Sequence, residues 1–138
     1  MQKDYEYNKI KKCIFFYNNL FICFNLFSDK PSVSLTRTAT TANYGETVTI
    51  QCKVVANPAT TSVYWQKLTT GNNDVTIDTS NTAKYGGATI ASPSLIIKNL
   101  DSSDIANYIC FAANSVGTGQ SGQGSLNVIG SKLVFHIQ

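Results

Sequence analysis

The chain has 138 residues, enough for one domain with a sizeable core and too few for two ordinary domains. Hydrophobic residues make up 43% of it, but charged residues only 14%, against about a quarter in typical globular proteins. The formal net charge is +3, and residues 31–138 hold six basic and five acidic residues. Because this region has no basic stripe to meet a phosphate backbone, nucleic acid is not expected as a partner.

The first thirty residues differ from the rest. Lysines precede an apolar run from Cys13 to Phe27, which asparagines interrupt. A basic segment before a short apolar one is the layout of a secretory signal peptide, with Ser28 as the small residue at the cleavage site. The run is shorter than the roughly 20 residues that span a bilayer. An uncleaved membrane anchor, an artefact of the gene model and a fragment edge remain alternatives. Residues 1–28 and the tail 130–138 are therefore expected to lie outside the domain.

Between Pro31 and Ile129 the chain shows short alternating segments and no helical periodicity. Stretches rich in Gly, Pro and Asn separate them and favour turns. Alternation of this kind is typical of strands with one buried face, so the predicted fold class is all-β, a sandwich or barrel. The residues predicted to face inward are, in chain order, Val48, Ile50, Cys52, Val54, Val63, Trp65, Leu95, Ile97, Leu100, Leu126 and Val128.

The four cysteines fall into two groups. Cys13 and Cys23 lie in the apolar N-terminal run, whereas Cys52 and Cys110 lie 58 positions apart in two strand-like segments. No C-x-x-C spacing occurs, and His136 is the only histidine, so a zinc site is not expected. A long-range disulfide is the better use of Cys52 and Cys110, and it would imply an oxidising compartment.

The segment SSDIANYICFAAN, residues 102–114, alternates over its whole length. Tyr108 lies two residues before Cys110, and Trp65 lies thirteen residues after Cys52. Three motifs accompany this spacing: GETVTIQC at the first cysteine, DIANYIC at the second, and CFAANSVG following from it. Together they resemble the immunoglobulin superfamily, in its intermediate (I-set) or variable-like type.

The resemblance implies a two-sheet antiparallel Greek-key sandwich over residues 31–129. It implies that a Cys52–Cys110 disulfide joins strands B and F, that Trp65 of strand C packs on it, and that Tyr108 is the tyrosine corner. Leu95 is expected in the same core. Asp104 could pair with Lys84, or both charges could stay solvated. Residues 72–93 exceed what a minimal intermediate-type domain needs, so a variable-like excursion is an alternative.

No arrangement of side chains predicts catalysis. His136 lies outside the predicted domain, so no nucleophile has a nearby imidazole base. The pairs Asp74 with Asp78 and Asp101 with Asp104 are too sparse for a calcium loop and are typical of turns. The stretch GTGQSGQG precedes a strand instead of opening a helix, unlike a phosphate loop. We expect a protein that is not an enzyme, without cofactor or metal, and no small-molecule substrate is evident.

The alternation also predicts what faces outward on strands C and F. We call this outer surface the C–F face, with the residues Tyr64, Gln66, Ile109 and Phe111. An apolar cluster of this kind often marks protein–protein contact, and the resemblance implies the same, since this face is a frequent dimer or ligand surface in the family. Two alternatives remain. Residues 72–93, with Tyr85, could fold over the face, or the loops 56–61 and 114–122 could bind the partner instead.

The function expected is a non-catalytic extracellular protein-binding module, secreted or at the cell surface, in adhesion or immune-type recognition. Its partner would be a protein, either a second copy or another immunoglobulin-like domain, and a membrane only if residues 1–28 stay attached. The alternatives are an intracellular structural module of a larger muscle-type protein and a fragment of a multidomain receptor. These expectations rest on family analogy.

Overall fold

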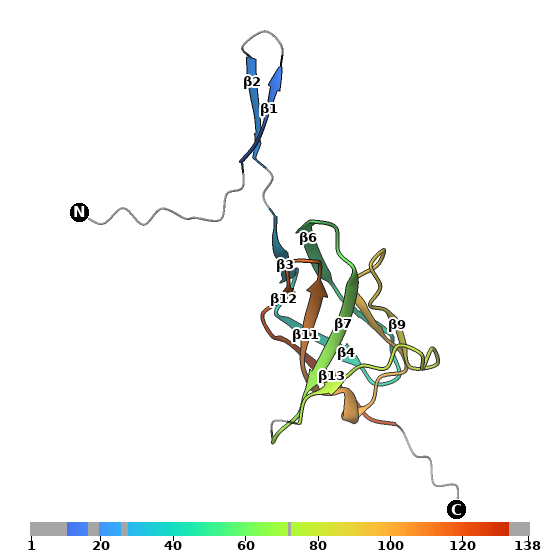
Figure 1. The fold of residues 1–138 in the computed structure, drawn as a ribbon. Coiled ribbons are helices and arrows are strands. Elements are labelled where there is room, and N and C mark those ends of the chain that lie inside the picture. Colours follow the sequence, from blue (N-terminus) through green and yellow to red (C-terminus); the bar gives the residue numbers. More distant parts are fainter. Residues whose placement is uncertain (1–10, 17–19, 26–27, 72, 133–138) are drawn as a thin grey trace, which may run out of the picture.

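The computed structural model describes residues 11–16, 20–25, 28–71 and 73–132. Figure 1 shows the chain as a succession of strands with one short 3₁₀ turn, η1. In order, the elements are β1 (Lys11–Phe16), β2 (Leu20–Asn25), β3 (Asp29–Leu35), β4 (Ala39–Asn43), β5 (Val48–Ile50), β6 (Cys52–Asn57), β7 (Ser62–Leu68), β8 (Val75–Thr76), β9 (Tyr85–Gly87), β10 (Leu95–Ile97), η1 (Ser102–Asp104), β11 (Ala106–Ala113), β12 (Thr118–Gln120) and β13 (Gly124–Ile129).

Two β-layers enclose the core. The first has the order β4-β13-β11-β7-β8, with β12 also paired to β11. The second has the order β5-β10-β9, and β6 extends it by pairing with β3, since only Gln51 separates β5 from β6. Among the described strand pairs, β4 with β13 is parallel and the others are antiparallel. The prediction of an all-β sandwich is confirmed.

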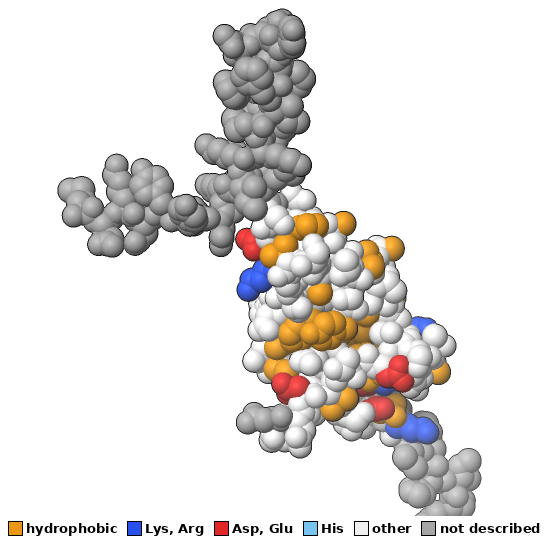
Figure 2. Space-filling view, in the orientation of Figure 1, with side chains coloured by type: hydrophobic (Ala, Val, Ile, Leu, Met, Phe, Trp, Pro, Cys, Tyr) orange, Lys and Arg blue, Asp and Glu red, His pale blue; other side chains and the backbone are white. Residues whose placement is uncertain are grey.

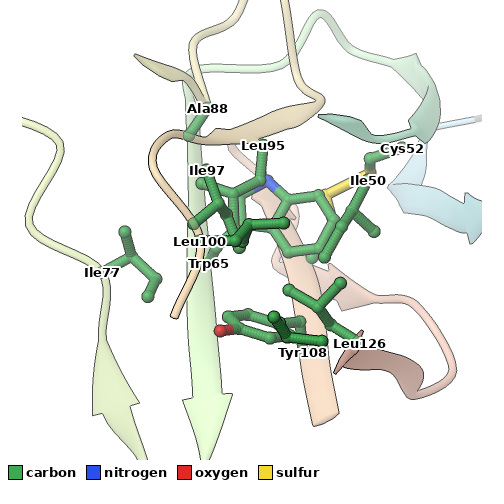
Figure 3. Packing of buried hydrophobic residues seen from close by; sticks show 12 residues of the cluster. Ile50, Cys52, Trp65, Ile77, Ala88, Leu95, Ile97, Leu100, Tyr108 and Leu126 are labelled. Carbon is green, nitrogen blue, oxygen red and sulfur yellow. A yellow bond between two sulfur atoms is a disulfide. The ribbon is translucent and has the colours of Figure 1, made fainter. Parts of the chain in front are cut away.

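The core lies between the layers and is centred on aromatic and aliphatic side chains from both. Trp65 and Tyr108 are fully buried, and the Trp65 Nε1–H donates a 2.8 Å hydrogen bond to the Pro93 carbonyl. The Cys52–Cys110 disulfide joins β6 to β11 and so links the two layers. Cys110 opposes Trp65 in the register of β11 and β7, and Figure 3 shows the indole beside the disulfide. Every residue predicted to face inward is buried or half-buried.

The chain passes from one layer to the other between β3 and β4. β3 pairs with β6 in the second layer, whereas β4 pairs with β13 in the first. The alternating pattern did not predict β4, because ATTAN contains no large apolar residue to mark a buried face. Residues 36–38 form the crossing, and the Thr36 N–H donates to the Gln51 carbonyl at 3.1 Å.

The N-terminal expectation concerns residues that the structure describes only in part. β1 and β2 pair with each other in a two-stranded sheet, with Cys13 and Cys23 at directly opposed register positions. The segment around the expected cleavage site includes Leu26 and Phe27, which lie outside the described residues, as does His136. In the part of the chain that is described, no helix has the length and apolar content to cross a membrane.

Candidate protein-binding face

The C–F face is built by two long neighbouring strands. β7 and β11 pair over seven positions, and the register sets Tyr64 opposite Phe111 and Gln66 opposite Ile109. Because side chains alternate along a strand, these residues share the surface opposite Trp65 and Cys110. The rings of Tyr64 and Phe111 stack with centroids 4.8 Å apart and planes 2° from parallel. Both residues are half-buried, so the stacked pair keeps surface available for a partner.

Ile109 differs from the expectation of an exposed residue. Only 9% of it is accessible, although it is not part of the core cluster. β11 is central in its layer, with β7 on one side and β12 and β13 on the other, so neighbouring side chains cover Ile109. The exposed apolar part of the C–F face is therefore the Tyr64–Phe111 pair, with Ile109 beneath the surface beside it.

The C–F face carries no charged residue at the outward positions of its two described strands, which are Ser62, Tyr64, Gln66, Leu68, Asn107, Ile109, Phe111 and Ala113. Asn107 Nδ2 donates to Gln123 Oε1 at 3.0 Å, so an amide pair borders the apolar part. Figure 2 looks onto this face and shows hydrophobic side chains across its middle, with charged groups nearer the margins. Removing such a surface from water costs little desolvation of charge.

Residues 72–93 were an alternative cover for the C–F face, but Tyr85 does not lie over it. Tyr85 begins β9, which pairs with β10 in the second layer, and its side chain packs on the core cluster. Burial raises the pKa of its phenol, with the nearby Asp104 carboxylate as the next cause. β8 lies beside β7 in the same layer, with Gln66 opposite Thr76. Among the described residues of 72–93, the strands are therefore β8 and β9, at the edges of the two layers.

The loops 56–61 and 114–122, the alternative binding surface, are connected by the buried side chain of Asn114. Asn114 is 8% exposed, and its Nδ2 donates to the carbonyls of Asp29 at 2.7 Å and Pro58 at 3.0 Å. Its Oδ1 accepts from the N–H groups of Val116 and Gly117. In the sequence, Asn114 stood out only as part of a motif and of the loop 114–122, and its structural role was not predicted. Its four hydrogen bonds fix the loops 56–61 and 114–117 against the start of β3.

Apart from Trp65 of β7, the residues predicted as the core signature lie in β10, in β11 and in the 3₁₀ turn between them. Leu95 in β10 is fully buried. Tyr108 Oη donates a 2.8 Å hydrogen bond to the Asp104 carbonyl, and burial raises the pKa of this phenol. Asp104 Oδ2 lies 2.6 Å from Lys84 Nζ and also accepts from the Asp101 N–H. The structure thus contains the ion pair that the sequence left open.

The described residues offer no arrangement for metal binding. They contain no group of three or more His, Cys, Asp or Glu side chains placed to hold an ion. The carboxylates of Asp78 and Asp101 bond to local backbone and hydroxyl groups instead. Hydrogen bonds from the Ser80 hydroxyl and N–H lower the pKa of Asp78, and bonds from Ser103 lower the pKa of Asp101. Asp78 and Asp101 therefore act as turn and capping residues.

Comparison with known proteins gives the family. No curated protein matches the chain. A solved structure described as "Tandem Ig repeats of Dlar" matches with a TM-score of 0.60 and 30% identity, over 74% of this chain and 47% of that one. This chain therefore spans about half the length of that protein chain. The family model for the immunoglobulin domain matches residues 30–114, which is more than half of the chain.

Immunoglobulin domains are generally non-catalytic and generally mediate contacts between proteins. The strand arrangement, the disulfide between the layers and the tyrosine corner agree with the family match. The chain belongs to the immunoglobulin-domain family.

Proposed function

We propose that residues 31–129 form an extracellular recognition domain that binds a protein partner through the C–F face. The observation that carries this proposal is the stacked Tyr64–Phe111 pair, half-buried on a surface whose outward strand positions are uncharged. Tyrosine and other aromatic residues are enriched at interface centres, where they bury large areas with little loss of side-chain freedom. The partner we infer is a second copy of this chain or another immunoglobulin-like domain.

The extracellular location is supported by the Cys52–Cys110 disulfide and by the signal-like residues 1–28. Disulfides persist in oxidising compartments and are rare in the cytosol. The location can be tested by expressing the full chain in secretory cells and measuring the intact mass of the protein in the medium. We expect a product that begins at Asp29 and gains two hydrogens on reduction. Folded chain with free thiols in the cytosol, and none in the medium, would favour an intracellular structural module.

The binding face is tested with the full chain presented as a tetramer on streptavidin. The tetramer is applied to a panel of cell types, and self-association of the free chain is followed by sedimentation. Tyr64→Ser with Phe111→Ser should abolish staining or self-association, since it removes the aromatic anchor. Val55→Ser with Ile90→Ser is the matched control, because both residues are exposed and neither lies on the C–F face.

The outcomes distinguish binding through the C–F face from binding through the loops 56–61 and 114–122. Equal binding by the Tyr64→Ser, Phe111→Ser variant and the parent would overturn the C–F proposal. Loss of binding on Val116→Ser alone would assign recognition to the loops, where Val116 is 49% exposed. The circular dichroism and unfolding midpoint of each variant must match those of the parent before its binding is compared.

A further inference from the structure

A pocket of about 370 Å³ lies where the chain crosses from β3 to β4, beside β5. It is separate from the C–F face, because none of its lining residues belongs to β7 or β11. Its volume lies within the range of about 300–1,000 Å³ that is typical of ligand sites. The lining residues are Thr36, Arg37, Thr40, Val48, Thr49 and Gln51.

The pocket gathers polar side chains that have no partner within the described part of the chain. Arg37 is the only arginine of the protein, and both described ion pairs belong to Lys84 instead. The hydroxyls of the three lining threonines and the amide of Gln51 likewise make no hydrogen bond to the described residues. One guanidinium, three hydroxyls and one carboxamide are therefore free to bond to a ligand.

The charged side chains on the outward strand positions next to the pocket are basic. The outward positions of β5, β6 and β10 and the residues beside them include Lys53 and Lys98, and no carboxylate. Glu46, the nearest acidic residue along the chain, accepts hydrogen bonds from the N–H and side chain of Asn43. Arg37 therefore has no competing carboxylate among the lining residues, and an anionic ligand would meet a favourable potential.

The geometry points to an acidic saccharide as the ligand of this pocket. A guanidinium binds a carboxylate or sulfate through two parallel hydrogen bonds, which fixes the orientation of the anion. The three hydroxyls and the carboxamide match sugar hydroxyls, which both donate and accept. An acidic peptide is a poorer fit, because Val48 is the only apolar side chain in the lining.

The test titrates the full chain, labelled with ¹⁵N, with methyl glucuronide, with methyl glucoside and with glucose 6-sulfate. We expect backbone shift changes at residues 36–40 and 48–51 with the two anionic sugars and none with the neutral glucoside. The two acids distinguish a carboxylate from a sulfate as the preferred group. Arg37→Gln should weaken binding by about tenfold or more, since it removes a charge-assisted bidentate contact.

Lys30→Gln is the matched control, because it removes the same charge at the opposite end of β3 from Thr36, outside the pocket lining. It should change the affinity by less than about twofold, because an exposed charge about 20 Å away along the strand is screened by salt. Equal losses in Arg37→Gln and Lys30→Gln would overturn the proposal in favour of a diffuse electrostatic effect. Shift changes with the neutral glucoside, or none with either acid, would also overturn it.

Discussion

Lys84 Nζ and Asp104 Oδ2 lie 2.6 Å apart, although twenty residues separate them in the chain. The Asp104 side chain is only 2% exposed, and it also accepts a 2.9 Å hydrogen bond from the Asp101 N–H. Lys84 Nζ donates in addition to the Asn99 carbonyl at 3.1 Å. The pair therefore ties the segment before β9 to the 3₁₀ turn before β11.

Removing Lys84 should be costly, because it leaves Asp104 buried with an uncompensated charge. We expect Lys84→Met to lower the free energy of unfolding by about 3 kcal/mol. The measurement is urea unfolding followed by Trp65 fluorescence at neutral pH. Lys98→Met is the control, because the Lys98 ammonium donates to the Thr82 carbonyl and has no carboxylate partner in the described ion pairs. A loss no larger than that of the control would show that the pair contributes little.

The Cys52–Cys110 disulfide should supply a large part of the stability. It closes a loop of 58 residues, and restriction of the unfolded chain by such a loop contributes about 4 kcal/mol. Cys52→Ala with Cys110→Ala should lower the unfolding free energy by about this amount while the circular dichroism of the folded state stays that of a β-sandwich. A variant as stable as the parent would mean that the core alone holds the layers together, as an intracellular role would require.

The sequence predicted the sandwich because its long strands alternate clearly. In β11 the apolar residues Tyr108, Cys110 and Ala112 are buried at every second position, and in β7 Trp65 is buried with the half-buried Val63 two residues before it. The spacing of Trp65, Tyr108 and the cysteines indicated how these strands meet. It did not predict β4, which consists of small residues and threonine, nor the crossing between layers. Such a strand is fixed by its parallel pairing with β13, a long-range contact without a local signal.

The candidate face was predicted in part. Alternation indicated that Tyr64 and Phe111 face the same way, but not that their rings stack. It could not distinguish Ile109 from Phe111, because burial on the outer face depends on neighbouring strands rather than on position along one strand. The pocket at Arg37 had no sequence signal either, since its lining comes from a crossing segment, from β4, from β5 and from Gln51 after it.

Tyr108 should make the fold sensitive to alkaline pH. Burial raises the pKa of its phenol above the ordinary value of about 10, so the folded state holds this proton more tightly than the unfolded state. The stabilisation is complete below about pH 10 and is lost as the pH rises further.

Tyr108→Phe should cost about 1 kcal/mol at neutral pH, through loss of the bond to the Asp104 carbonyl, and should flatten the alkaline decline. Denaturant midpoints from pH 8 to 11 test this. Tyr44→Phe, at an exposed tyrosine, should keep the decline of the parent. An equally steep decline in Tyr108→Phe would assign the alkaline sensitivity to another group.

Asn114 should control the order of the end loops. Asn114→Ala removes four hydrogen bonds and leaves the carbonyls of Asp29 and Pro58 without this donor. We expect a loss of about 2–3 kcal/mol and faster amide hydrogen exchange at residues 116–118. Asn127→Ala, at an exposed position of β13, is the control and should change neither. Unchanged exchange in Asn114→Ala would mean that loop packing, and not this side chain, orders the end of the domain.

Gly119 in β12 should tolerate no side chain, because β12 passes close to the start of β3. A Cβ at this position would lie 1.8 Å from the Pro31 carbonyl oxygen, a backbone atom that cannot rotate away. Gly119→Ala should therefore force β3 and β12 apart and lower the unfolding free energy by about 2–3 kcal/mol. Gly122→Ala is the matched control, since a Cβ there meets no atom within 4 Å. Equal unfolding midpoints for the two variants would mean that β3 can shift away from β12 at little cost, and that the close approach does not fix the position of the first strand of the domain.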